Sequence, residues 1–199
     1  MNQPITLEQL LASRDARRGK QLQLLADYPG QTLIVLTVVI PGNIKRTDDS
    51  LTIAQAGCDA LDNVLKGHGH CAMKEDLPTG FEAYFLTDHP SDFAKQLASE
   101  IEDRHPLGRM MDIDVFDTEG NSVSRTAFGR PTRRCLLCGN DARICMRAFT
   151  HSQSELLAEI HRRVKLWQKS AGMHIQGSPH KESGMSAAGV NGPIQPNPS

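Results

Sequence analysis

The spacing of apolar and polar residues predicts a domain in which helices and strands are interspersed. Apolar positions recur at helical spacing in four segments, residues 7–26, 50–66, 90–104 and 152–168. Thr6 with Gln9 forms a capping box at the first of these segments, and Ser152 begins a similar box at the last. Strand-forming residues cluster between turn signals at residues 32–40, 81–87 and 110–117, where we expect strands.

The predicted strand at residues 110–117 is followed by the turn TEGN and by the stretch SVSRTAF, a pattern that favours a hairpin. Helices interspersed with strands indicate an α/β or α+β fold, with a mixed sheet and flanking helices. From Ser170 onward Gly, Pro, Ser and Asn dominate and no periodicity remains. We therefore expect a single domain at residues 1–169 and a disordered tail at residues 170–199.

Composition is typical of a globular protein in a reducing compartment. The longest apolar run, residues 33–40, is too short to span a bilayer, and the N-terminus lacks the pattern of a secretory signal. The five cysteines are an odd number and three of them are clustered, which argues against a disulfide framework. We expect a cytoplasmic protein without a membrane partner.

Charge is distributed unevenly along the chain. Between Arg125 and Lys169 there are ten Lys or Arg and three Asp or Glu, although the whole chain has a net charge of −1. A basic segment of this kind can bind phosphates or an acidic partner. The chain has only two Tyr and one Trp and no nucleic-acid motif, so the sequence does not favour nucleic-acid binding.

Three cysteines and a histidine form the most specific local motif. Cys135, Cys138, Cys145 and His151 follow one another at C-x2-C-x6-C-x5-H spacing. Two thiolates separated by a two-residue turn can bind one metal ion, and four such ligands would satisfy tetrahedral Zn²⁺. Three alternatives remain open. Cys135 and Cys145 are small buried residues, one of the thiols is reactive beside arginines, or His151 merely precedes the Ser152 cap.

Arginines crowd the same segment. Within eighteen residues the chain carries Arg130, Arg133, Arg134, Arg143 and Arg147. A planar guanidinium can make paired hydrogen bonds to phosphate oxygens. This loop is therefore a candidate phosphate-binding element.

Asp112 and Asp114 lie two residues apart in the predicted strand at residues 110–117. Residues at this spacing point to the same face of a strand, with Cα atoms about 6.5–7 Å apart. Like charges on one face repel unless a cation or solvent lies between them. Either the two carboxylates bind a cation, or they are solvated residues of an edge strand.

Four segments together resemble a known family. They are LLASRDARR (10–18), TVVIPGNIK (37–45), HPLGRMMDIDV (105–115) and RRCLLCGNDARICMRAFTH (133–151). Over residues 5–168 the chain is similar to the apo-citrate lyase phosphoribosyl-dephospho-CoA transferases. The resemblance implies transfer of 2′-(5″-triphosphoribosyl)-3′-dephospho-CoA to a serine of the acyl carrier (gamma) subunit of citrate lyase, with release of diphosphate.

The implied reaction is nucleotidyl transfer, in which divalent cations and arginines stabilise the charge that develops on phosphate oxygens. Asp112 and Asp114 would then hold one or two Mg²⁺ ions, and a nucleotidyltransferase-like fold is expected, although the usual upstream Gly-Ser element is not evident. Arg109 is a further catalytic candidate. His105 is a candidate base for the serine, unless it only caps a helix.

Phosphate contacts are expected from the turn after the first strand and from the arginine-rich loop. The candidates are Gly42, Lys45, Arg130, Arg133, Arg134 and Arg147. Arg14, Arg17 and Arg18 form a second basic cluster, and Asp117 and Glu82 are weak candidates for a third metal-binding carboxylate. Two rival functions remain: the same chemistry on another carrier, such as that of malonate decarboxylase, or a non-enzymatic zinc-knuckle module that binds an acidic partner.

Overall fold

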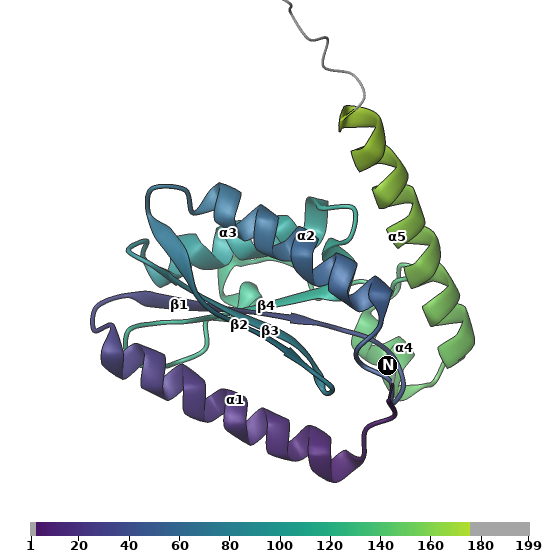
Figure 1. The fold of residues 1–199 in the computed structure, drawn as a ribbon, viewed down its shortest axis with the longest axis horizontal. Coiled ribbons are helices and arrows are strands. Elements are labelled where there is room, and N and C mark those ends of the chain that lie inside the picture. Colours follow the sequence, from purple (N-terminus) through teal and green to yellow (C-terminus); the bar gives the residue numbers. More distant parts are fainter. Residues whose placement is uncertain (1–2, 176–199) are drawn as a thin grey trace, which may run out of the picture.

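The computed structural model describes residues 3–175, which form one four-stranded sheet with helices on both of its faces (Figure 1). In chain order the elements are α1 (Leu7–Asp27), β1 (Thr32–Val38), α2 (Asp48–Val64), β2 (Gly69–Leu77), β3 (Gly80–Thr87), α3 (Ser91–Arg104), β4 (Met111–Phe116), α4 (Ala142–Arg147) and α5 (Gln153–Ile175). Helix α5 passes the domain boundary expected at residue 169, and most of the tail expected at residues 170–199 lies outside the described residues. None of the described helices combines the length and hydropathy needed to cross a membrane.

The strand order is β2-β3-β1-β4, and every neighbouring pair is antiparallel. The predicted combination of a sheet with flanking helices is confirmed in its α+β form, and the sheet is antiparallel rather than mixed. Strand β2 was not expected, because GHCAMKEDL contains Gly, Lys, Glu and Asp, which are depleted in strands. Its pairing with β3 decides its conformation.

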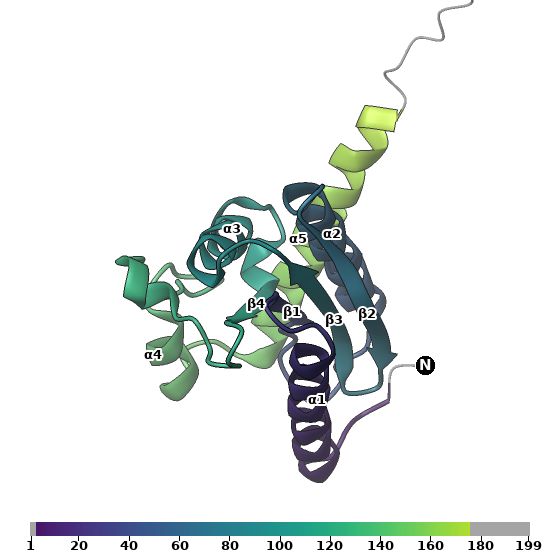
Figure 2. The same ribbon diagram turned by 90° about the vertical axis from the view of Figure 1, so that its left-hand side faces the viewer.

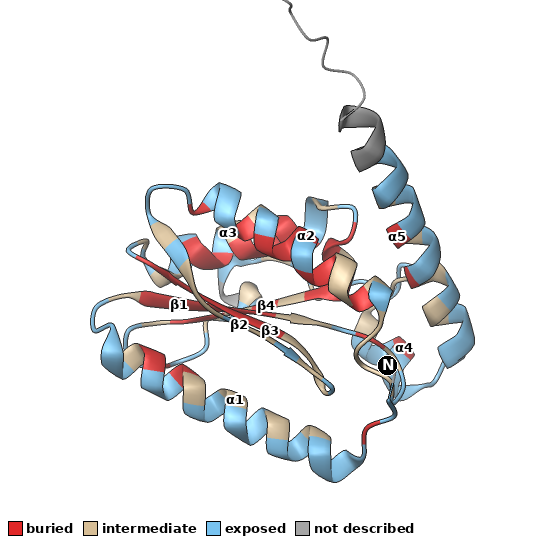
Figure 3. Ribbon diagram, viewed as in Figure 1, coloured by how far each residue is buried: buried red, intermediate tan, exposed pale blue. Residues whose placement is uncertain are grey.

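The two faces of the sheet are covered differently. Helices α2 and α3 lie on one face and α1 lies on the other (Figure 1). The main core forms between the sheet and α2, α3 and α5; its sheet residues include Ile34, Leu36, Phe85, Met111, Ile113 and Val115. A smaller cluster faces α1 and comprises Leu24, Leu33, Val35, Tyr84, Leu86 and Phe116. Within α1 only Gln21 and Leu24 are buried, so the helix packs through its C-terminal half (Figure 3).

Capping residues next to the helices determine where most of the helices begin. The capping boxes at Thr6 and Ser152 are both present. A further box, in which Thr47 and Ser50 exchange hydrogen bonds, starts α2 before the expected position. The hairpin expected after β4 is reduced to one bridge between Phe116 and Ser122, because SVSRTAF turns into a short 3-10 helix, Arg125–Phe128.

Candidate active site

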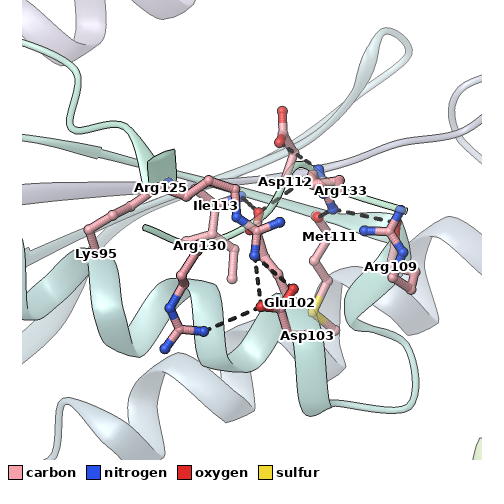
Figure 4. A network of polar contacts seen from close by, with 10 residues as sticks. All are labelled: Lys95, Glu102, Asp103, Arg109, Met111, Asp112, Ile113, Arg125, Arg130 and Arg133. Carbon is pink, nitrogen blue, oxygen red and sulfur yellow. Dashed lines mark hydrogen bonds and ion pairs between the residues drawn. The ribbon is translucent and has the colours of Figure 1, made fainter. Parts of the chain in front are cut away.

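Strand β4 is an edge strand, and charged side chains satisfy its outward-facing backbone groups (Figure 4). The Ile113 N–H donates to the carboxylate of Glu102 at 3.0 Å, and the Ile113 carbonyl accepts from Lys95 at 2.8 Å. Arg133 donates to the Met111 carbonyl. Because an unpaired edge is both unstable and prone to association, these contacts fix β4 without a fifth strand.

Asp112 and Asp114 flank the fully buried Ile113 and share one face of the strand, as predicted; this face is the α1 side of the sheet. Asp112 accepts a 2.9 Å hydrogen bond from Arg133, and its side chain is 44% exposed. Asp114 has no hydrogen bond or ion pair within the described part of the chain. Burial, and then the charge of Asp112, raise the pKa of Asp114 above its ordinary value. A crowded carboxylate pair of this kind would be stabilised by a bound cation.

The strand register extends this polar site across the sheet. Asp112 is opposite Thr37, Thr37 is opposite Glu82, and Glu82 is opposite Glu75, so one row of polar residues crosses all four strands. Asp114 lies in the next row, with Val35 opposite it. Side chains in such a row lie on one face of the sheet, about 4.5–5.5 Å from their neighbours. The α1 face therefore carries the acidic residues of three strands.

Glu82 is buried and fully paired. Its carboxylate accepts from Arg17 at 2.9 Å, from Lys20 at 3.4 Å and from the Tyr84 hydroxyl at 2.5 Å. Lys20 also pairs with Glu75. These contacts join α1 to the sheet, a role that the sequence did not reveal. Of the two weak candidates for a third carboxylate, Glu82 is engaged here and Asp117 shapes the turn after β4 by accepting from Asn121 and Glu119.

A cluster of arginines lies between the β4 edge and α3, and one of them, Arg133, bonds to Asp112 (Figure 4). Arg125 and Arg130 pair with Asp103 at 2.7 and 3.3 Å. The Nε atoms of Arg109, Arg125 and Arg133 are buried without a hydrogen-bond partner among the described residues. Burial, and then the charge of Arg133, lower the pKa of Arg109. Unpaired guanidinium N–H groups that repel one another favour a nearby anion.

The predicted arginines divide into two groups. Arg109, Arg130 and Arg133 lie near the β4 edge, where Arg133 bonds to Asp112 and Arg130 pairs with Asp103 of α3. Arg134 is exposed, and its nearest polar contact is the Gly139 carbonyl at 3.5 Å. Arg147 is also exposed and makes no ion pair with a described residue. Phosphate binding by either group remains a prediction.

Three other predicted residues are engaged in local structure. His105 Nδ1 accepts from the Leu107 N–H at 3.0 Å, and the ring lies 4.7 Å from that of Trp167; burial lowers the pKa of His105. Lys45 donates to the Ile40 carbonyl at 2.6 Å. Gly42 has a φ of 83°, and a Cβ there would meet the side chain of Gln153.

The local contacts of His105, Lys45 and Gly42 are enough to account for the residue found at each position. Their roles in catalysis and substrate binding therefore stay predictions. A base acting through His105 Nδ1 would have to give up its bond to Leu107.

The Cys/His motif is assembled in space. One ligand atom from each of Cys135, Cys138, Cys145 and His151 lies within 4.8 Å of the others. The polar surroundings of the Cys138 thiol, chiefly the Asn140 backbone, lower its pKa to about 6. The pKa of Cys145 is raised to about 11, chiefly by its hydrogen bond with Cys138. The segment projects beyond the β4 side of the sheet (Figure 2).

A surface hollow of about 380 Å³ lies elsewhere, lined by residues 67–70 and 86–88 with Gln31. It is at the Thr32 end of β1, where Thr32 is opposite Thr87, five positions along the strand from Thr37. The hollow therefore does not coincide with the Asp112 row. The charged groups, rather than this hollow, identify the candidate site.

Comparison with known proteins gives a consistent result. A sequence model of the family described as apo-citrate lyase phosphoribosyl-dephospho-CoA transferase matches residues 5–167. A protein of Vibrio cholerae described as a probable member is 38% identical over 160 residues, which cover 78% of this chain and 89% of the relative. A Citrobacter koseri transferase is 37% identical over 77% of this chain and 85% of its own length. The Haemophilus influenzae protein CitXG is 38% identical, and the match spans about a third, 34%, of that longer relative.

Proposed function

Because the chain belongs to the apo-citrate lyase phosphoribosyl-dephospho-CoA transferase family, we propose that it attaches the prosthetic group to the acyl carrier (gamma) subunit of citrate lyase. The donor would be 2′-(5″-triphosphoribosyl)-3′-dephospho-CoA and the acceptor a serine hydroxyl. The serine oxygen bonds to the α-phosphorus, the bond from that phosphorus to the bridging oxygen breaks, and diphosphate leaves. The hydroxyl proton passes to solvent or to a base, and a phosphodiester remains.

The carboxylate pair at Asp112 and Asp114 supports this proposal most directly. Both side chains point to one face, and Asp114 lacks any ion-pair or hydrogen-bonding partner among the described residues. Oxygen ligands of this kind suit Mg²⁺, which is bound in proteins through one or two carboxylates and substrate phosphates. Magnesium held by this pair would neutralise charge on the phosphate oxygens during transfer.

The arginines next to the pair would bind the triphosphate. Arg133 is held by the Met111 carbonyl and by Asp112, which fixes its guanidinium at the β4 edge. The Arg109 carbonyl accepts from Arg133 at 3.4 Å, and the Arg109 Nε is buried with no partner among the described residues. Donors that are already oriented stabilise developing negative charge without further reorganisation. Arg133 and Arg109 would thus hold the departing diphosphate close to the carboxylates.

Mass spectrometry of the carrier tests the proposal. The full chain is incubated with apo carrier, the triphosphoribosyl donor and Mg²⁺, and we expect a gain of one phosphoribosyl-dephospho-CoA on serine. Asp112→Asn and Asp114→Asn should prevent the gain. Asp76→Asn is the matched control, because Asp76 lies on β2 and pairs with Arg46, away from the carboxylate pair. An unmodified carrier with the wild-type chain would refute the proposal.

A second incubation addresses the choice of carrier. Replacing the citrate lyase carrier by the apo carrier of malonate decarboxylase should leave the second carrier unmodified. Equal modification of both would show that the family assignment alone does not define the acceptor. A non-enzymatic zinc-knuckle module would modify neither.

A further inference from the structure

The Cys/His cluster has the dimensions of a metal site. Its four ligand atoms lie within 4.8 Å of one another, and the Sγ atoms of Cys138 and Cys145 are 3.4 Å apart. Around tetrahedral zinc, with Zn–S of about 2.3 Å and Zn–N of about 2.0–2.1 Å, ligand atoms are roughly 3.5–3.8 Å apart. The side chains therefore need only small shifts to surround one ion.

The turn that carries Cys135 and Cys138 has a backbone conformation that holds the two thiols close together. The Cys135 N–H donates to the Asn140 carbonyl at 2.6 Å, closing the loop around Cys138. Gly139 has a φ of 74°, a left-handed conformation that favours glycine. The loop therefore places Cys135 and Cys138 on one side of a tight turn, the arrangement that lets two thiols three positions apart reach one ion.

The chain returns to the cluster through a strained residue. Phe149 has a φ of 48°, which is uncommon for any residue with a side chain, and its side chain is 88% exposed. It ends α4 in a Schellman motif, with Phe149 N–H bonded to the Met146 carbonyl and Thr150 N–H to the Cys145 carbonyl. This reversal brings His151 beside Cys145. Because the exposed phenyl ring has little packing to compensate for the strain, the reversal is best explained by the position that it gives His151.

The His151 side chain has a buried Nε2 with no hydrogen-bond partner among the described residues. The following helix is capped by Ser152 and Glu155, which bond to one another without His151. A buried imidazole nitrogen that lies beside three sulfurs and has no partner outside the cluster is what a metal ligand requires.

Neither a disulfide nor simple burial accounts for the cluster. A sulfur separation of 3.4 Å between Cys138 and Cys145 exceeds the disulfide bond length of about 2.05 Å. Cys138 is exposed and Cys135 is only half-buried, so they are not core residues in the way that the fully buried Cys58 is. The hypothesis of small buried side chains therefore applies at most to Cys145.

We propose that Cys135, Cys138, Cys145 and His151 bind one structural Zn²⁺ ion. All four positions are filled by protein ligands, which leaves no open site for a substrate and is typical of structural zinc. The segment has little apolar core of its own, since Ile144, Met146 and Phe149 are 66%, 69% and 88% exposed. Metal binding would supply the stability that burial does not.

The zinc would also position the candidate active site. Arg133, two residues before Cys135, is the residue that bonds to Asp112. In the turn between Cys135 and Cys138, the Leu136 carbonyl accepts from Arg163 of α5 at 3.1 Å. The metal-bound segment would therefore be anchored at α5 and would hold Arg133 at the β4 edge.

Metal analysis of the purified full chain tests the proposal. Zinc measured by plasma mass spectrometry after gel filtration should approach about one ion per chain. Cys138→Ser should lower the zinc content about tenfold or more, because one of four ligands is lost. Cys71→Ser is the matched control; this half-buried thiol on β2 lies outside the cluster and should leave the zinc content unchanged.

Cobalt substitution provides a readout of ligand type. Co²⁺ in place of zinc should give the absorption of a tetrahedral thiolate site, with weaker thiolate-to-cobalt bands in Cys138→Ser and unchanged bands in Cys71→Ser. Circular dichroism confirms that each variant is folded. A folded wild-type chain that binds neither ion, or a Cys138→Ser variant that retains both, would overturn the proposal. Neither result depends on carrier modification, so this test and that of the proposed function can fail separately.

Discussion

The two faces of the sheet use the same strands for different purposes. On the α2 and α3 side, β1 and β4 contribute aliphatic residues such as Ile34, Ile113 and Val115, all fully buried. On the α1 side, the alternate positions of β4 are Asp112 and Asp114. Since side chains alternate along a strand, one face can support the fold while the other holds reactive groups. The position of Ile113 between the two aspartates shows this division within three residues.

The α1 side itself contains two kinds of acidic residue. Glu82 is buried and neutralised by Arg17, Lys20 and the Tyr84 hydroxyl. Asp114 is half-buried and faces another carboxylate, with no ion pair to a described residue. A buried charge with partners is part of the structure, whereas one without partners indicates a binding site. This difference distinguishes the candidate catalytic residues from the residues that fix α1.

The largest expected effect is on activity, from the unpaired carboxylates. Asp114→Asn should lower the rate of carrier modification by about 10³-fold or more, equivalent to about 4 kcal/mol of transition-state stabilisation. The same substitution should raise the melting temperature in magnesium-free buffer, because it removes repulsion from Asp112. Asp112→Asn should lose activity without this gain, since Asp112 bonds to Arg133. An active Asp114→Asn variant would contradict the division between paired and unpaired carboxylates.

On the α2 and α3 side of the sheet, a substitution should lower stability and leave activity largely unchanged. Ile113→Ala removes a fully buried side chain and should lower the free energy of unfolding by about 2–5 kcal/mol. Transfer activity per folded molecule should change little below the melting temperature, because the side chain points away from Asp112 and Asp114. Urea unfolding followed by circular dichroism, together with the transfer assay, measures both quantities. A large loss of activity in fully folded Ile113→Ala would show that the two faces are not independent.

Removing the paired carboxylate should mainly affect stability. Glu82→Gln leaves Arg17 and Lys20 without their buried partner and should lower the free energy of unfolding by about 1–3 kcal/mol, less than a fully buried pair because both cations are about a quarter exposed. Glu75→Gln is the control, since Glu75 is more exposed and pairs with Lys20 alone among the described residues. If Glu82→Gln instead abolished transfer at unchanged stability, Glu82 would belong with the reactive carboxylates.

The smallest expected effect is on stability and comes from Glu159 on α5, a helix that packs against the main core. Hydrogen bonds from Arg162 and Arg163 lower the pKa of Glu159 to about 2 from an ordinary value of 4.5. A lowered folded-state pKa stabilises the fold above about pH 4.5, and this contribution disappears as the pH falls toward 2. Glu159→Gln should therefore cost about 1 kcal/mol at neutral pH, after allowance for solvent around the arginines, and nothing near pH 2.

Chemical denaturation across this pH range measures the difference between wild type and Glu159→Gln. Glu100→Gln is the control, because Glu100 makes an exposed pair with Arg104 and should show a much smaller pH-dependent change. A difference for Glu159→Gln that persists unchanged at low pH would rule out an electrostatic origin.

Features that depend on short segments were predictable from the sequence. The capping boxes, the common face of Asp112 and Asp114, and the C-x2-C-x6-C-x5-H spacing all follow from backbone geometry within a few residues. Family membership was likewise evident from four segments of the chain and is confirmed by the match over residues 5–167. Most of the helices and three of the four strands follow from the same local periodicities, whereas β2 forms because β3 supplies its hydrogen bonds.

Only the tertiary structure decided which charges are paired. Arg17 meets Glu82 across 65 positions of sequence, and Arg133 meets Asp112 across 21. It also placed Lys45 and His105 in local hydrogen bonds, although their residue types suggested substrate contacts. The sequence determined which groups could carry the chemistry. Packing of α1 against the sheet and the contact of Arg133 with the β4 edge determined which of those groups are neutralised, because charges are paired through space and not along the chain.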